Sequence, residues 1–199
     1  MNVVFRVDAS VQMGSGHLMR CLTLAQELQQ RAVQARFICG DHLGNLNDWL
    51  QNKGIAVTVL SNASGIDVGT DAKQTISTLS ADRPDWMVVD HYGLDIEWEQ
   101  RLRPFVGRIL VIDDHTGRRH DCDVLLDQNY AGEDGLRYGG LVPDDCRMLL
   151  GPSFALLRKE FGELRQKVSR RQSLENVLVF FTGGDDQGET LKAMRGVEI

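Results

Sequence analysis

Short apolar runs alternate along the chain with stretches in which apolar residues recur every three or four positions. Such runs are typical of buried strands, and the wider spacing is typical of amphipathic helices. The predicted strands are 3–7, 35–39, 55–60, 85–90, 108–113, 124–129, 147–151 and 176–181. The predicted helices are 17–31, 46–54, 72–82, 96–105 and 154–168. This alternation predicts an α/β fold with a Rossmann-like, mostly parallel sheet flanked by helices.

A polar stretch, SRRQSLE (169–175), divides the predicted elements into two unequal groups. We expect residues 1–170 to form an N-terminal Rossmann-like domain. Beyond them, only one apolar run and one glycine-rich turn leading into a helix follow, and one strand with one helix cannot bury a core. Residues 171–199 are therefore predicted to hold a linker and the first β–α unit of a truncated C-terminal domain.

The composition narrows the class of protein. With 42% hydrophobic and 25% charged residues the chain is typical of a soluble globular protein, and its net charge of −6 argues against binding nucleic acid or anionic membranes. No signal peptide and no membrane-length apolar run occurs. The four cysteines lack the spacing of a zinc site. These features predict a cytoplasmic protein with reduced thiols.

Polar residues follow several predicted strands, where the sheets of open α/β proteins bind their ligands. We expect these residues to converge on one rim, and His91, Tyr92 and Asn129 are candidates for contact with a substrate. A metal site is not expected, because adjacent Asp and His side chains seldom face the same point and strand-end acids commonly cap helices. The polar loops are 8–20, 90–93, 113–121 and 128–132.

The segment MGSGHLMR (13–20) resembles two phosphate-binding motifs and matches neither. It lacks the Lys-Ser/Thr of a P-loop, and Met19 stands where a dinucleotide motif has its third glycine. Gly14 and Gly16 permit close backbone approach. At a helix start, the dipole would disfavour a protonated His17, so that a neutral imidazole could act as a general base. The alternative is a tight turn in which His17 is only a polar residue.

Three other clusters carry weaker signals. The turn TGGDDQG (182–188) could bind phosphate at a helix N-terminus, although Gly-Gly is also common in ordinary turns. The preceding GPSF segment could direct Arg158 into the cleft. The basic residues Arg118, Arg119 and His120 are expected to lie in a solvated loop.

Taken in order, FRVDAS, GSGHLMR, DHYG, DD, QNY, PSFALLRKEF and GGD resemble the UDP-sugar hydrolases of pseudaminic acid biosynthesis, over nearly all 199 residues. The resemblance implies a two-domain GT-B-like architecture related to MurG-type transferases, a monomer, and no cofactor or metal. It implies that water attacks the anomeric carbon of a UDP-linked diacetamido-trideoxy sugar with inversion and that UDP leaves. His17 would position and deprotonate that water.

The resemblance also implies where the small-molecule substrate binds. The nucleotide-binding residues would be Gly183 and Gly184. Asp185 stands where the family has a small hydroxyl residue and is followed by Asp186, and two carboxylates there would repel a diphosphate. With most of the second domain absent, we expect the chain alone to turn over little. A glycosyltransferase of the same architecture and a sugar-binding domain without turnover remain alternatives. The substrate-binding residues would be Gly14, Ser15, Gly16, Arg20, His91, Tyr92, Asn129 and Arg158.

Overall fold

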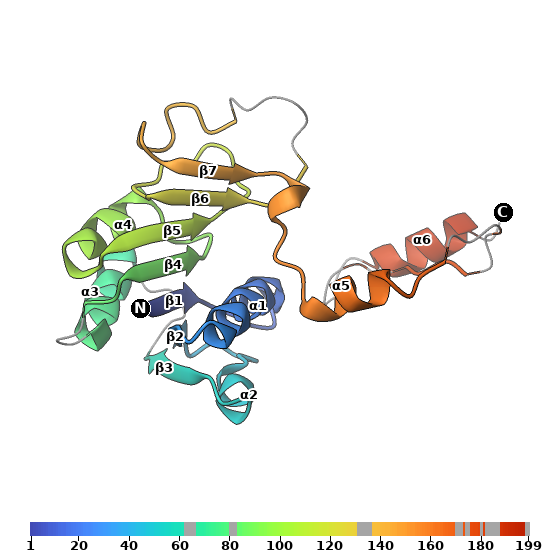
Figure 1. The fold of residues 1–199 in the computed structure, drawn as a ribbon, viewed down its shortest axis with the longest axis horizontal. Helices are drawn as coiled ribbons and strands as arrows, with labels where there is room; N and C mark the ends of the chain where they lie inside the picture. Colours follow the sequence, from blue (N-terminus) through green and yellow to red (C-terminus); the bar gives the residue numbers. More distant parts are fainter. Residues whose placement is uncertain are drawn as a thin grey trace.

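The computed structural model describes residues 1–61, 67–79, 83–130, 137–169, 173, 176–179, 181 and 188–197. In these residues seven parallel strands form one sheet in the order β3-β2-β1-β4-β5-β6-β7 (Figure 1). The strands are β1 (Asn2–Val7), β2 (Gln34–Gly40), β3 (Ala56–Leu60), β4 (Trp86–Asp90), β5 (Arg108–Ile112), β6 (Val124–Asp127) and β7 (Arg147–Leu150). The helices are α1 (Gly16–Gln30), α2 (Asn47–Asn52), α3 (Val68–Leu79), α4 (Ile96–Leu102), α5 (Lys159–Arg165) and α6 (Glu189–Val197), with short 3-10 turns η1 (Arg103–Phe105) and η2 (Pro152–Phe154).

The strand order creates a switch point in the middle of the sheet. From β1 the chain winds outward through β2 to β3 and then returns to place β4 on the other side of β1. Val4 is paired with Arg36 of β2 and with Met87 of β4. The carboxyl ends of β1 and β4 therefore border the crevice in which open α/β sheets bind ligands. The predicted α/β class and Rossmann-like parallel sheet are confirmed.

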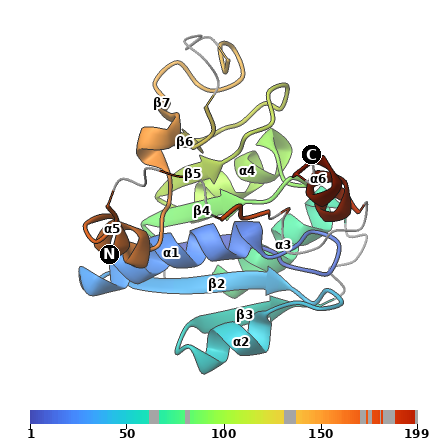
Figure 2. The same ribbon diagram turned by 90° about the vertical axis from the view of Figure 1, so that its right-hand side faces the viewer.

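Helices cover both faces of the sheet. In Figures 1 and 2, α1 and α2 lie over one face and α3 and α4 over the other. On the first face, Leu18 and Cys21 of α1 are buried with Phe5 and Phe37, whose rings stack at 4.8 Å. On the second face, Trp98 of α4 is fully buried among strand residues. Each face of the sheet therefore has its own core, in which the apolar side of the covering helices packs against buried strand side chains.

The bounds of all five predicted helices differ somewhat from the structure, and two of them, α3 and α5, differ by four residues or more at their starts. Helix α3 begins at Val68 rather than at residue 72, because Asp67 accepts a hydrogen bond from the backbone N–H of Thr70 at 3.0 Å and caps the first turn. The helix expected over 154–168 is shorter. Residues 155–158 lie outside any helix, and only Lys159–Arg165 forms α5.

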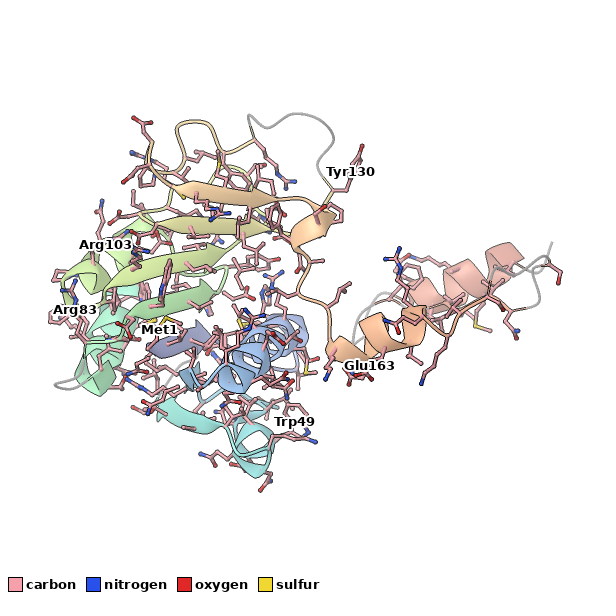
Figure 3. The ribbon with its side chains drawn as sticks, viewed as in Figure 1. Met1, Trp49, Arg83, Arg103, Tyr130 and Glu163 are labelled. Carbon is pink, nitrogen blue, oxygen red and sulfur yellow. The ribbon has the colours of Figure 1, made fainter. Side chains whose placement is uncertain are left out.

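The short α5 reflects a lack of packing. Its apolar side chains Phe161 and Leu164 are about half exposed, and no residue of α5 is buried. Most helical stability in proteins comes from packing of an apolar face. Because α5 has no such packing, further helical turns are not stabilised. Figure 3 shows α5, with Glu163 labelled, standing away from the sheet.

The strand expected over 176–181 is not found: residues 176–179 and 181 are not in a strand. A strand needs a neighbour for its backbone hydrogen bonds, and the sheet in the described residues ends at β7. Gly183 and Gly184 lie outside the described residues, and the division at residue 170 stays a prediction. None of the helices in the described ranges is long and apolar enough to cross a bilayer.

Candidate functional site

A cavity of about 340 Å³ lies at the switch point of the sheet. Its walls come from the loop after β1, the start of α1 and the loop after β4. The predicted residues His17, His91 and Tyr92 are thus brought together, although they are far apart in the chain. The lining residues are Asp8, Gln12, Met13, His17, Asp90, His91, Tyr92 and Gly93.

His17 stands in the first turn of α1 and contacts a carboxylate buried at the end of β4. Its Nδ1 is 2.6 Å from Oδ1 of Asp90, whose side chain is fully buried. Nδ1 also lies 3.1 Å from Nη2 of Arg20, which can only donate. Because the contact with Asp90 is the shorter one and an ionised carboxylate only accepts hydrogen bonds, we assign the proton to Nδ1, which donates a hydrogen bond to Asp90. The other ring nitrogen, Nε2, then keeps its lone pair, and it has no protein partner among the residues described. This arrangement presents a hydrogen-bond acceptor or base on a ring that lines the cavity.

Arg20 keeps Asp90 ionised. Its Nε and Nη2 lie 2.5 and 2.6 Å from the two oxygens of Asp90, a bidentate pair one helical turn below His17. Burial by itself would raise the pKa of Asp90, but the hydrogen bonds from Arg20 and His17 hold that pKa below its ordinary value. The charge of Arg20 is therefore already neutralised by Asp90, and its Nη2 also lies 3.1 Å from Nδ1 of His17.

The neighbouring residues Asp90 and His91 point to different partners, as expected. Nε2 of His91 lies 3.2 Å from Oδ2 of Asp8, and the backbone N–H of Gly93 donates to Nδ1 of His91 at 3.0 Å. These two contacts assign the proton of His91 to Nε2. Nε2 of His42 lies 3.0 Å from the same oxygen of Asp8. No group of three or more His, Cys, Asp or Glu suited to a metal occurs in the described ranges.

Tyr92 forms the side of the cavity next to His17. The two rings meet edge to face at 4.6 Å, and His115 contacts the tyrosine ring in the same manner at 4.7 Å. The phenol hydroxyl donates to Oδ1 of Asp114 at 2.8 Å. Burial and this carboxylate together raise the pKa of Tyr92 to about 12. Tyr92 is therefore a neutral side chain whose hydroxyl already has an acceptor.

Asn129 reaches the same carboxylate from the loop after β6. Its Nδ2 donates to Oδ2 of Asp114 at 3.0 Å, and its backbone N–H donates to Asp127 at 3.0 Å. Asn129 does not line the cavity but is joined to Tyr92 through Asp114. The predicted pair Tyr92 and Asn129 is thus brought to one cluster.

The glycine-rich loop owes its shape mainly to Gly14. Gly14 has a φ of +71°, which favours glycine, and its N–H donates to the carbonyl of Ser10 at 2.8 Å. At Gly16 a Cβ would meet nothing within 4 Å, so open space rather than protein lies beside it. Ser15 precedes α1 and makes no side-chain capping bond. The loop therefore turns sharply and leaves the start of α1 uncovered.

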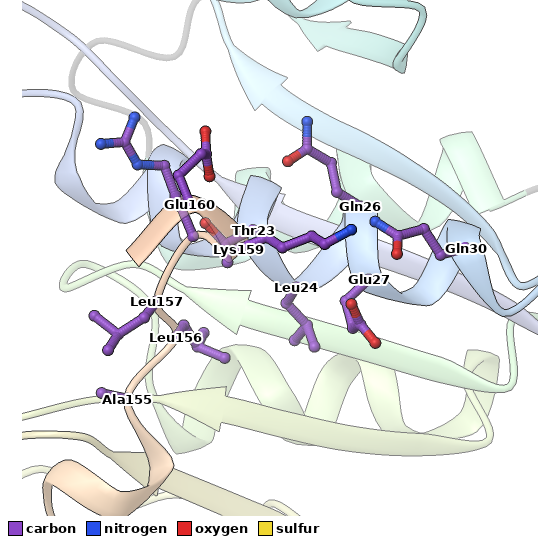
Figure 4. Close-up of a pocket in the computed structure, with 11 residues that line it drawn as sticks. Thr23, Leu24, Gln26, Glu27, Gln30, Ala155, Leu156, Leu157, Lys159 and Glu160 are labelled. Carbon is purple, nitrogen blue, oxygen red and sulfur yellow. The ribbon is translucent and has the colours of Figure 1, made fainter. Parts of the chain in front are cut away.

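Arg158 is not brought to this cavity, so its position gives no support to the predicted contact with the substrate. It precedes α5, is exposed, and stacks over Phe161 at 5.3 Å. It lines a separate hollow of about 320 Å³ against the outer face of α1 (Figure 4). Thr23 and Glu27 line the opposite side of that hollow.

The loop carrying Arg118 and His120 is not a solvated basic loop, and that expectation is wrong for both residues. His120 is 2% exposed and is held between Glu99, 2.7 Å from Nδ1, and Asp113, 2.9 Å from Nε2. Arg118 pairs with Asp113 at 2.8 Å and also binds the backbone carbonyl of Tyr92. Arg119 is exposed, as expected.

Sequence reasoning missed several residues of the site. The acids at strand ends were visible, but the pattern carried no signal for which basic or hydroxyl group each would hold. His42 and His115 had no distinguishing motif. The missed residues are Asp8, His42, Asp90, Asp114 and His115.

Two curated proteins are similar in sequence to this chain. The chain is 33% identical over 162 residues to the UDP-2,4-diacetamido-2,4,6-trideoxy-beta-L-altropyranose hydrolase of Campylobacter jejuni, an alignment of 81% of this chain and 53% of that protein. It is 22% identical over 200 residues to the uncharacterized protein MJ1062 of Methanocaldococcus jannaschii, 98% of this chain and 39% of that protein. The chain thus spans about half the length of these curated relatives or less. The identity to the hydrolase supports a family relationship.

A solved structure was also found. Acinetobacter baumannii MurG matches 64% of this chain and 41% of its own, with 12% identity and a TM-score of 0.48. No protein-family model matches the chain. The Rossmann-like fold is shown by the strand order of the sheet.

Proposed function

We propose that this chain carries the catalytic histidine of a UDP-sugar hydrolase, in which water attacks the anomeric carbon of a UDP-linked diacetamido-trideoxy sugar. The observation that carries the proposal is the Asp90–His17 pair at the switch point, with Nε2 of His17 unpartnered in the described residues. The 33% identity to a protein named as such a hydrolase supports the choice of substrate.

In the proposed step, Nε2 of His17 accepts a proton from a water molecule as its oxygen bonds to the anomeric carbon. The bond between that carbon and the phosphate oxygen breaks, and UDP leaves with the electron pair. Because water attacks the face opposite to UDP, the anomeric configuration is inverted. Asp90 stabilises the imidazolium that forms, because its ionised carboxylate accepts a charge-assisted hydrogen bond from the Nδ1–H, and the proton stays on the imidazole. The product is the free sugar with a new hydroxyl.

The charges around the cavity favour an uncharged part of the substrate at His17. Three arginines near the rim are each paired with a carboxylate: Arg20 with Asp90, Arg118 with Asp113, and Arg137 with Asp127 at 3.3 Å. A diphosphate would need charges that these pairs do not offer. We therefore place the sugar against His17 and leave the diphosphate to Gly183, Gly184 and other groups.

An assay without an acceptor tests the reaction class. The purified chain, and a version extended to the length of its relatives, are incubated with the UDP-sugar in water, and products are followed by NMR. Release of UDP and of free sugar with inverted configuration is expected from the extended version at least. UDP release only after an acceptor is added would indicate a transferase, and binding without release from either version would indicate a sugar-binding domain.

Substitution of His17 tests the assigned base. His17→Asn should lower kcat by roughly 10²–10⁴-fold, the usual contribution of a general base, while the Kd for the UDP-sugar stays within about threefold. Calorimetric titration measures the Kd, and circular dichroism checks the fold. Near-normal turnover in this variant would refute the role of His17.

A further inference from the structure

Asp114 differs from the other carboxylates around the cavity. Asp8, Asp90, Asp113 and Asp127 each form an ion pair with an arginine. Asp114 has no ion pair within the described ranges, and its two oxygens accept from neutral donors instead. Those donors are the hydroxyl of Tyr92 at 2.8 Å and the side-chain amide of Asn129 at 3.0 Å.

These two hydrogen bonds join three loops at the carboxyl edge of the sheet. Tyr92 follows β4, Asp114 follows β5 and Asn129 follows β6. The backbone of Asp114 is also fixed, because its carbonyl oxygen accepts from Arg137 at 2.6 Å. Asp114 is therefore the point at which the loop after β5 sets the position of its two neighbours.

The position of Tyr92 bears directly on His17. Nδ1 of His17 is bound to Asp90 and also lies 3.1 Å from Nη2 of Arg20, so this end of the imidazole is held, and the edge-to-face contact with Tyr92 at 4.6 Å restricts the ring from a second side. Tyr92 is 46% exposed, and besides His17 its ring meets His115 at 4.7 Å and the guanidinium of Arg118 at 5.6 Å. The hydrogen bond from the Tyr92 hydroxyl to Asp114 fixes the end of the side chain that is farthest from the backbone.

We propose that Asp114 is a positioning residue, which holds the ring of Tyr92 against His17 through the hydroxyl of Tyr92 and braces that contact through Asn129. The catalytic consequence rests on the proposed function, since it concerns the direction of Nε2 of His17. The structural part does not depend on any substrate. Asp114 acts on His17 only through Tyr92.

The structural part is tested by NMR of the whole chain. The ring current of each aromatic ring shifts the C–H signals of the other, so Tyr92→Ala gives the reference for a lost contact, and His17→Asn assigns the His17 signals. Asp114→Ala should move the His17 signals toward the Tyr92→Ala values. Asp114→Asn should keep them near wild type, because an amide oxygen still accepts the tyrosine hydroxyl, but should lower the pKa of Tyr92 from about 12 toward its ordinary value of 10.

Asp144→Ala is the matched control, because it also replaces an aspartate by alanine, but Asp144 is exposed and is not among the residues that line the cavity. It should leave the His17 signals unchanged. The proposal is overturned if Asp114→Ala leaves the His17 signals at their wild-type values in a folded protein. It is also overturned if Asp114→Asn disturbs them as much as Asp114→Ala does.

The catalytic part is read in the hydrolysis assay. Asp114→Ala should lower kcat on the order of tenfold with KM within about twofold, Asp114→Asn should restore most of kcat, and adding Tyr92→Phe to Asp114→Ala should cost little more. The kinetics are measured in the version extended to the length of its relatives. If that version shows no hydrolysis before any substitution, the proposed function fails while the NMR result still decides the role of Asp114. Moved His17 signals with unchanged kcat would overturn the catalytic part alone.

Discussion

At the scale of single residues, His17 is defined by what each of its ring atoms meets. Nδ1 is occupied by Asp90, one edge of the ring is covered by Tyr92, and Nε2 remains without a protein partner in the described residues. The residue next to Asp90, His91, is turned to Asp8 instead. Two adjacent polar residues of one strand end therefore serve separate groups, one holding the proposed base and one the end of β1.

Removing the charge of Asp90 should affect both stability and turnover. In Asp90→Asn, the guanidinium of Arg20 loses its bidentate carboxylate, and breaking such a pair by removing one partner costs about 3–5 kcal/mol. The amide can also present its NH₂ to Nδ1 of His17, which favours the wrong tautomer, so kcat should fall by about 10²-fold or more. Urea unfolding and the UDP-release assay measure the two effects.

Asp48→Asn provides the matched control for this experiment. Asp48 is exposed on α2, so the variant removes the same charge without touching an arginine or a histidine. It should leave both the free energy of unfolding and kcat near wild type. Turnover of Asp90→Asn within twofold of wild type would contradict the assignment of Asp90.

At the scale of elements, His120 links α4 to the carboxyl end of β5. It lies between Glu99 of α4 and Asp113 after β5, and Arg118 also faces Asp113. Burial by itself would lower the pKa of His120, but the hydrogen bonds and charges of Asp113 and Glu99 raise it to about 9. The imidazolium therefore holds together the loop that carries Asp114.

This link predicts a pH dependence of stability. Because the pKa of His120 in the folded protein exceeds its ordinary value of 6.5, its contribution is complete below about pH 6.5 and is lost as the pH rises through 9. The loss should be on the order of 3 kcal/mol. Urea unfolding at pH 6, 8 and 10 measures it. His120→Gln should lack this part of the dependence, and an equal decline in the variant would assign it to other groups.

A second element-scale prediction concerns the turn before β5. At Gly107 a Cβ would lie 2.5 Å from the backbone oxygen of Asp85, which cannot move without shifting β4. Gly107→Ala should therefore lower the free energy of unfolding by about 1–3 kcal/mol. Gly162→Ala is the control, because a Cβ there meets nothing within 4 Å and α5 buries no residue. Equal stability of the two variants would show that the turn yields easily.

At the scale of the whole molecule, the buried side chains and the last two helices are separate. Every buried residue of the described ranges lies between Val3 and Cys146, and Leu156 is the last side chain packed against a core. Helices α5 and α6 bury none. The stability of the sheet therefore depends on the first 158 residues.

Removal of residues 159–199 should accordingly leave the thermal unfolding midpoint within about 2 °C of that of the full chain. Leu156→Ala in the full chain should lower it, because that side chain packs against the core that includes residues of α1. Calorimetry measures both. A drop of more than about 5 °C on truncation would show that α5 and α6 stabilise the sheet.

The sequence alone was enough for the sheet strands and for most helices, because local periodicity reports which side of an element is buried. It also located His17 at a helix start and the polar loops at the strand ends. It did not predict the extent of α5, because helix length there depends on a packing surface that only the fold reveals. Nor did it predict the position of Arg158, which the end of β7 and the 3-10 turn after it direct to the outer face of α1.

The partners in the site were decided only by the tertiary structure. His17 and Asp90 are 73 residues apart in the chain, and Tyr92 and Asp114 are 22 residues apart, so sequence spacing does not predict either contact. The strand order places β1 beside β4 and β4 beside β5, and this brings the ends of those strands together. Which acid neutralises which base then depends on side-chain direction at each strand end, a property of three-dimensional packing that residue type and order do not specify locally.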